Sequence, residues 1–190
     1  MYYKLSNIAE IKTLENDFEA CMEHPSLYRP RPIVNGLNEE TLSVIISERP
    51  DQIIPGIWGI LPENYTDDWT MFQKVTNTLN IHENEISSKI WYAEALKKRR
   101  CLVLVTGFFT SFLHMGEVYP FHVGLASGRP FCLGGIYNIL EDGFLTCSLL
   151  TTRANGFMQQ IQNLGFDMPL FISKKLNKEW LNGDIGISEI

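Results

Sequence analysis

Long apolar runs, paired cysteines and an excess of positive charge are all missing from this sequence of 190 residues. No apolar stretch reaches the roughly 18 residues that a membrane-spanning helix needs, so we expect no membrane partner. The opening MYYKLSNIAE has no apolar core of the signal-peptide type. The formal charge of −6 disfavours broad, nonspecific binding of nucleic acid, although a local basic groove stays open.

Metal sites and common catalytic motifs are also missing. The four cysteines (Cys21, Cys101, Cys132 and Cys147) are widely spaced without a CxxC pair. We therefore expect core thiols in a reducing, cytoplasmic compartment, and no zinc site. His82, Glu83 and Glu85 are close in sequence, but alternate residues of an extended chain point to opposite sides, so we expect no metal there. No phosphate-binding GxxxxGK[ST], GxSxG or HExxH pattern occurs, and we expect no cofactor.

The most informative stretch is LKKRRCLVLVTGFFTSF, residues 96–112. Four cations, Lys97, Lys98, Arg99 and Arg100, run into the apolar segment Cys101–Val105. This pattern predicts a helix that ends in cations and is followed by a buried strand. The cations fit either a phosphate-binding patch or a solvated helix end, and the run alone does not decide between them.

The remaining pattern mixes short strands with peripheral helices. We predict a helix after an Asn7 cap, with Glu10 completing a capping box. Further helices are predicted from Asp67 or Asp68, from Ser87 or Ser88 to Lys98, and over residues 154–162 and 174–181. Strands are predicted over residues 42–47 and 55–62, and about four more between residues 101 and 151. We expect turns at Met115-Gly116, Ser127-Gly128 and Asp142-Gly143. The sequence thus predicts an α+β fold, with residues 1–190 forming one domain.

Several motifs occur together in a fixed order. They are WGILP (58–62), LN-x-H (79–82), KKRRCLVLVTGFF (97–109), PF-x-LGGIY (130–137), TT-x-AN (151–155), I-x-N followed by MP (161–169), and EWL (179–181). In this order and spacing the chain resembles the SOS response-associated peptidase family, also called abasic-site processing proteins. The resemblance covers roughly residues 1–182 and implies a compact α+β fold. It also implies a barrel-like sheet core and a positively lined groove for single-stranded DNA.

The resemblance also implies a covalent chemistry. Family members begin, after removal of methionine, with a cysteine whose α-amine and thiol close a thiazolidine ring on the aldehyde of an abasic site. Here that position is Tyr2, which has no thiol, and we expect its bulk to prevent methionine trimming, so that Met1 is retained. The family asparagine is kept as Asn80. Its glutamate falls on Thr110 and its proton-transferring histidine on Gln162, neither of which titrates as a base.

The family DNA-binding positions are mostly altered as well. The implied groove positions here are Lys4, Asn64, Tyr65, His82 and Asp167. The family has arginines where this chain has His82 and Asp167, and a tryptophan at Asn64. Lys97, Arg99 and Arg100 are further DNA-binding candidates.

These substitutions leave three functional hypotheses. The first is an inactive family member that binds single-stranded DNA or an abasic site without a covalent bond. The second is a protein-interaction module with no nucleic-acid role, which the acidic charge favours. The third is residual imine or lyase chemistry through the N-terminal amine. In each case we expect a monomer, and single-stranded DNA is the first candidate partner.

Overall fold

A computed structural model describes residues 2–190 of the chain. Its strands are β1 (Lys4–Asn7), β2 (Cys21–Met22), β3 (Arg31–Asn35), β4 (Thr41–Ile46), β5 (Arg49–Trp58), β6 (Asn80–His82), β7 (Arg100–Val105), β8 (Gly107–His114), β9 (Glu117–Val123), β10 (Phe131–Ile139), β11 (Leu145–Arg153), β12 (Asp167–Pro169) and β13 (Phe171–Ile172). Its α-helices are α1 (Ile11–Phe18), α2 (Trp69–Val75), α3 (Ile90–Lys98), α4 (Met158–Ile161) and α5 (Asn177–Asn182). Three 3₁₀ helices are η1 (Glu83–Ser88), η2 (Lys174–Leu176) and η3 (Ile187–Glu189).

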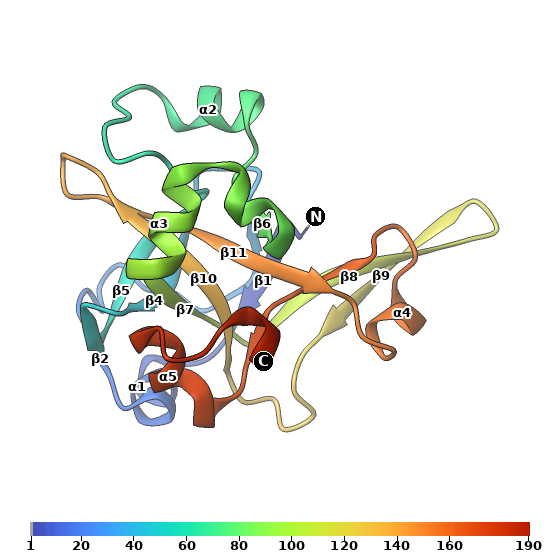
Figure 1. The fold of residues 1–190 in the computed structure, drawn as a ribbon. Helices are drawn as coiled ribbons and strands as arrows, with labels where there is room; N and C mark the ends of the chain where they lie inside the picture. Colours follow the sequence, from blue (N-terminus) through green and yellow to red (C-terminus); the bar gives the residue numbers. More distant parts are fainter. Residues whose placement is uncertain (1) are drawn as a thin grey trace.

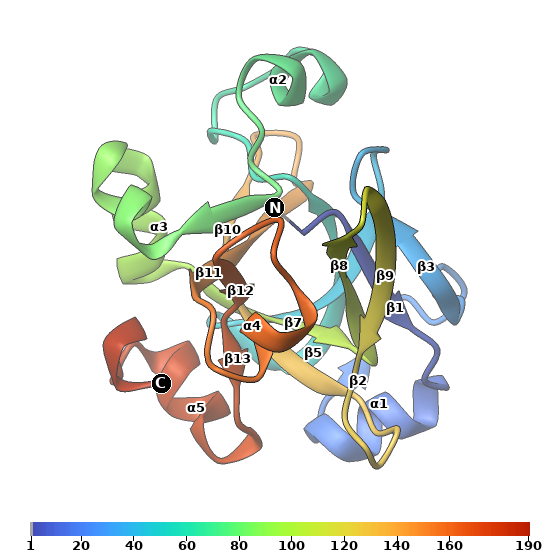
Figure 2. The same cartoon turned by 90° about the vertical axis from the view of Figure 1, so that its right-hand side faces the viewer.

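The larger sheet closes on itself. Its strands pair in the order β11–β10–β7–β4–β5, and β5 pairs again with β11 in parallel, at Thr146↔Ile57 and Cys147↔Trp58. This return pairing confirms the expected barrel-like core, and the mixture of a closed sheet with peripheral helices confirms the α+β class. Figures 1 and 2 show the helices arranged around this sheet.

Both faces of the barrel strands are buried. Cys101, Val103 and Val105 of β7 belong to one apolar cluster, while Leu102 and Leu104 belong to a second cluster that includes side chains of α1, α3 and α5. Alternate residues of a strand point to opposite faces, so the continuous apolar run follows from burial on both sides. The prediction of a buried strand at residues 101–105 is therefore confirmed.

A second sheet, in the order β3–β1–β8–β9, adjoins the barrel. Strands β8 and β9 form a hairpin that extends away from the body, and Figure 1 shows α4 beside it. The turn at Met115-Gly116 is as predicted, with positive φ at both residues. Phe108↔Val123 and Leu5↔Phe108 are register partners, so the base of the hairpin is anchored to β1.

Several predicted boundaries are wrong. Asn7 lies in β1, and the first helix begins at Ile11 after Glu10, because Asn7 uses its side-chain amide to donate to the Leu104 carbonyl oxygen (3.1 Å). The strand predicted over residues 55–62 runs over Arg49–Trp58, and five strands rather than four begin between residues 100 and 145. The helix predicted over residues 154–162 is shortened to α4.

The cysteine prediction is correct for three of the four thiols. Cys101, Cys132 and Cys147 are buried, whereas Cys21 is exposed in the short strand β2. All four are unpaired thiols. Among residues 2–190, no helix has the length and apolar character needed to span a membrane.

Candidate functional site

Tyr2 lies at the centre of a polar cluster assembled from distant parts of the chain. Its side chain is 4% exposed, and its ring packs edge-on against Phe108 with 5.4 Å between centroids. The phenol oxygen lies 2.6 Å from Gln162 Oε1 and 2.8 Å from the Asp167 carbonyl oxygen. With one hydrogen, the hydroxyl donates to either acceptor in turn. Burial raises the pKa of Tyr2 to about 12, so the phenol is neutral at physiological pH.

Gln162 links the cluster together. Its Oε1 also accepts a hydrogen bond from Thr110 Oγ1 at 2.9 Å. Its Nε2 donates to the carbonyl oxygens of Asp167 (2.6 Å) and Gly165 (3.3 Å). Both ends of this buried amide are therefore occupied, and neither Gln162 nor Thr110 can take up or release a proton at neutral pH.

Asn80 holds the backbone of Tyr2. Its Nδ2 donates to the Tyr2 carbonyl oxygen at 2.6 Å, while its buried Oδ1 has no hydrogen-bond partner within the described part of the chain. The parallel pairing of β6 with β11, at Leu149↔Asn80, fixes its position. Met1, and with it the predicted retention of that residue and the N-terminal amine chemistry, lies outside the described residues.

His82 and Asp167 meet across β11, the strand that pairs with both β6 and β12. Their closest atoms, Nε2 and Oδ1, are 3.4 Å apart. His82 Nδ1 accepts a hydrogen bond from the backbone N–H of Asn84 at 3.2 Å, which leaves the Nε2–H form to face the carboxylate. The two positions at which the resemblance implies arginines thus lie next to each other in this chain.

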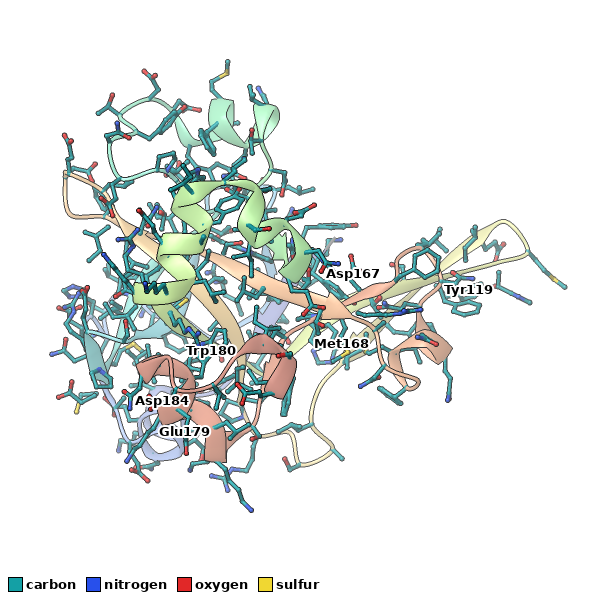
Figure 3. All side chains as sticks on the ribbon, viewed as in Figure 1. Tyr119, Asp167, Met168, Glu179, Trp180 and Asp184 are labelled. Atoms are coloured by element: carbon teal, nitrogen blue, oxygen red, sulfur yellow. The ribbon has the colours of Figure 1, made fainter. Side chains whose placement is uncertain are left out.

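A cavity of about 570 Å³ opens beside this cluster. Apolar and aromatic side chains form much of its wall, and Lys4 and Asp167 are its charged lining residues. The lining is Tyr2, Tyr3, Lys4, Ile33, Phe109, Thr110, Ser111, Val118, Pro120, Gln162, Leu164, Gly165 and Asp167. Figure 3 labels Asp167 where the body meets the β8–β9 hairpin.

The remaining predicted DNA-binding residues do not line this cavity. Asn64 is exposed in the loop before α2, and Tyr65 donates to the Asp68 carbonyl oxygen at 3.1 Å. Lys97 is exposed at the end of α3. Arg99 Nη1 forms an ion pair with Glu63 at 2.9 Å.

Arg100 is only 8% exposed, and its side chain contacts other parts of the chain rather than solvent. Its guanidinium donates to the carbonyl oxygens of Leu96 (2.8 Å), Trp180 (3.4 Å) and Ile185 (2.5 Å), and it lies 4.5 Å from the Trp180 ring centroid. Trp180 is labelled on α5 in Figure 3. The cationic run therefore divides between an exposed helix end and a buried anchor.

Sequence reasoning did not select the apolar members of the cavity. Tyr3, Ile33, Phe109 and Leu164 come from four separate segments, and each looks like an ordinary strand or loop residue in the sequence. A signal was available in the Phe108-Phe109 pair of β8, because successive residues of a strand point to opposite faces and Phe108 is the buried one. Within residues 2–190, no group of three metal-ligating side chains is assembled.

Comparison with known proteins gives a consistent result. A family model described as SOS response associated peptidase (SRAP) matches residues 1–188. The abasic site processing protein YoaM of Bacillus subtilis is 24% identical over 159 residues, which covers 80% of this chain and 66% of YoaM. The abasic site processing protein YMR114C of Saccharomyces cerevisiae is 31% identical over 98 residues, covering 50% of this chain and 26% of that protein. The chain thus matches less than two thirds of the length of either relative.

Solved structures support the fold. A protein from Bacteroides thetaiotaomicron superposes with a TM-score of 0.85 at 23% identity, covering 98% of this chain and 84% of that one. A protein from Bordetella bronchiseptica gives a TM-score of 0.76 at 15% identity, over 94% and 87% of the two chains. At these identities the likeness concerns the architecture alone.

Proposed function

Because the chain belongs to the SOS response-associated peptidase family, we propose that it binds single-stranded DNA or abasic sites without forming a covalent crosslink. Two relatives are named as abasic site processing proteins, which favours a role connected with abasic sites. The observation that carries the proposal is the position of Tyr2. Its phenol fills the inner end of the site and is hydrogen-bonded to Gln162, where the family chemistry requires a thiol.

Within residues 2–190, the cluster has no thiol, carboxylate or histidine at the three positions where the resemblance implies them, Tyr2, Thr110 and Gln162. Ring closure needs a thiol next to a free amine, and a phenol with a raised pKa supplies no nucleophile at neutral pH. Thr110 and Gln162 hydrogen-bond each other and cannot act as general bases. Non-covalent binding is still supported by Lys4 and by the aromatic wall of Tyr3 and Phe109, because unpaired bases stack on aromatic side chains.

The proposal is tested with a short labelled single strand that contains one abasic site. We expect fluorescence anisotropy to detect binding at low ionic strength, and denaturing gels to show no adduct with or without borohydride. Failure to detect binding would overturn the proposal that the chain binds single-stranded DNA. A borohydride-trapped adduct would overturn the proposal that no covalent bond forms, and would support the alternative of imine chemistry through the N-terminal amine.

Restoring the family residues gives the matching gain-of-function experiment. Tyr2→Cys combined with Thr110→Glu and Gln162→His supplies the thiol, the carboxylate and the proton shuttle. We expect this triple variant, once mass spectrometry confirms removal of Met1, to form a crosslink. Tyr3→Cys with the same two changes is the control and places a thiol one residue too far along the chain.

A protein-interaction role is the second candidate, and the β8–β9 hairpin favours it. The hairpin exposes Leu113, Val118, Tyr119 and Phe121, and Met115 at its turn is 90% exposed. Exposed apolar side chains grouped on one projecting element are typical of a protein contact surface. Variants with charged residues at Tyr119 and Phe121, which do not line the Tyr2 cavity, should leave DNA binding intact and would separate this candidate from the first.

A further inference from the structure

A second cavity, of about 540 Å³, lies away from Tyr2. Strands β1, β3, β4, β5 and β7 contribute to it, together with the segment 22–29 and Phe144 and Leu145 at the start of β11. None of its lining residues lines the Tyr2 cavity: Lys4 lines the Tyr2 cavity, and Leu5 begins the second one. Strand β1 is therefore the partition between two separate sites.

Much of the wall of this cavity is apolar, and Ser6, Asn7, Thr41 and Ser43 add hydroxyl and amide groups to it. Leu5, Val34, Leu42, Ile54 and Leu145 line it, and all five are buried. A volume of 540 Å³ falls within the range of about 300–1,000 Å³ that is usual for small-molecule sites. The wall thus suits the apolar body of a small molecule rather than a sugar or a phosphate chain.

Two arginines line this cavity. Arg29 and Arg31 are among its lining residues, together with His24, and Glu39 is the lining carboxylate. Arg31 is held in place, because it pairs with Glu40 and donates to the Thr41 carbonyl oxygen at 2.9 Å.

Arg29 keeps its charge available. It is exposed, donates one N–H to the Tyr28 carbonyl oxygen at 2.7 Å, and has no ion-pair partner among the described residues. Tyr28 itself is fixed, because its hydroxyl donates to the Ala9 carbonyl oxygen at 2.7 Å. Among the described residues, Arg29 thus offers an arginine without an ion-pair partner to a largely apolar cavity, in a chain of net charge −6.

We propose that this cavity is a second binding site, for an amphipathic anion that carries a carboxylate at one end of an apolar body. Arg29 binds the carboxylate, since a guanidinium presents two parallel N–H groups that match it. The apolar body lies against Leu42 and Ile54 and is removed from water. This inference goes beyond the proposed DNA function and does not depend on it.

The test compares three probes with the same ten-carbon chain and different heads, each titrated calorimetrically below its micelle concentration or, for decanol, below its solubility limit. We expect decanoate to bind with a stoichiometry of one, and decanol and decyltrimethylammonium to bind at least tenfold more weakly. Equal affinity for decanoate and decanol would overturn the anion preference. No saturable binding of decanoate would overturn the site itself.

Two further measurements locate the site. Arg29→Gln should weaken decanoate binding three- to tenfold and leave decanol binding unchanged, whereas Lys175→Gln, a change to an exposed lysine outside the lining, should alter neither. In the unaltered chain, decanoate should shift the amide NMR signals of Leu5, Leu42 and Ile54. Shifts confined to Tyr3 and Thr110 would place the probe in the other cavity and overturn the proposal.

The outcome is independent of the DNA experiment. Arg29→Gln should leave single-stranded DNA binding unchanged, because Arg29 does not line the Tyr2 cavity. A chain that binds decanoate and no DNA would refute only the proposed function, and the reverse result would refute only this site.

Discussion

Tyr2 is held in the candidate site through both its side chain and its backbone. A phenol is larger than a thiol, and here its hydroxyl satisfies Gln162 and the Asp167 carbonyl oxygen. Asn80 Nδ2 donates a hydrogen bond to the Tyr2 carbonyl oxygen, which fixes the backbone of Tyr2. The result is a buried, hydrogen-bonded cluster whose members do not titrate near neutral pH.

The raised pKa of Tyr2, about 12, makes a prediction for alkaline stability. In the unfolded chain the phenol ionises near pH 10, so between about pH 10 and 12 only the folded chain keeps the proton. Its stabilising contribution is complete below about pH 10 and is lost as the pH rises through 12. In Tyr2→Phe, the free energy of unfolding should therefore fall less steeply with pH between about pH 10 and 12. Circular dichroism measured against pH checks this.

At neutral pH the same variant should lose only about 1 kcal/mol, because Thr110 and Gln162 still satisfy the groups left behind. Tyr3→Phe is the control, since Tyr3 is exposed, and should not alter the alkaline profile. An unchanged profile in Tyr2→Phe would contradict the burial argument.

Arg100 gives a second prediction at this scale. Arg100→Met removes a buried guanidinium and its hydrogen bonds to the carbonyl oxygens of Leu96, Trp180 and Ile185, so we expect a loss of about 2–4 kcal/mol in urea unfolding. Lys98→Met, at an exposed neighbour, should change the free energy of unfolding by less than about 0.5 kcal/mol. Equal effects would contradict a buried structural role for Arg100.

At the scale of elements, β8 and the segment after β11 are joined by a side chain rather than a strand. The turn at Met115-Gly116 sets the hairpin register, so that the N–H and C=O groups of Leu113 point away from β9. Asn163 fills that place: its Oδ1 accepts from the Leu113 N–H (2.7 Å), and its Nδ2 donates to the Leu113 carbonyl oxygen (2.9 Å). This pair of bonds positions Leu164 and Gly165 at the wall of the Tyr2 cavity.

Asn163→Ala should therefore free the Leu113 amide. We expect its hydrogen exchange, measured by NMR, to accelerate at least tenfold, because the N–H loses its acceptor. Gln160→Ala, at an exposed position in α4, should leave this exchange rate unchanged. Protection that persists in Asn163→Ala would show that another group covers this edge of β8.

Gly135 tests the packing between neighbouring strands. A Cβ there would lie 2.6 Å from the Ser148 carbonyl oxygen and 2.9 Å from Cys101 Sγ. Gly135→Ala should destabilise the chain by about 1–3 kcal/mol in urea unfolding, since the backbone of β11 must move. Gly156→Ala, whose Cβ would meet nothing within 4 Å, is the control and should have little effect.

Predictions of elements succeeded where local pattern and burial agree. The run at residues 101–105 and the Met115-Gly116 turn are read directly from sequence. The helix cap predicted at Asn7 is wrong because an asparagine that caps a helix and one that hydrogen-bonds a neighbouring strand look alike in sequence. The helix predicted over residues 154–162 is reduced to Met158–Ile161, and Asn155 Oδ1 accepts a hydrogen bond from the N–H of its first residue, Met158 (3.0 Å).

At the scale of the whole molecule, closure of the barrel depends on the parallel pairing of β5 with β11, which are about ninety residues apart in sequence. No local pattern encodes that contact, and it entered only through the family resemblance. The same applies to the candidate site. Tyr2, Thr110 and Gln162 come together through tertiary structure, whereas the second cavity had no counterpart in any motif.

The distribution of charge yields the last prediction. Binding of a single strand releases counterions in proportion to the phosphates neutralised, with a slope of log K against log salt of about −0.7 for each. Lys4 is the lysine that lines the Tyr2 cavity, and His82 and Asp167 are paired with each other. We therefore expect one or two phosphate contacts and a slope between about −0.7 and −1.4 in anisotropy titrations.

Lys4→Gln should make this slope shallower by about 0.7, and Lys97→Gln should not change it. A slope of about −3 or steeper would mean that cations outside the cavity, such as the exposed end of α3, carry the binding, and would move the DNA path away from Tyr2.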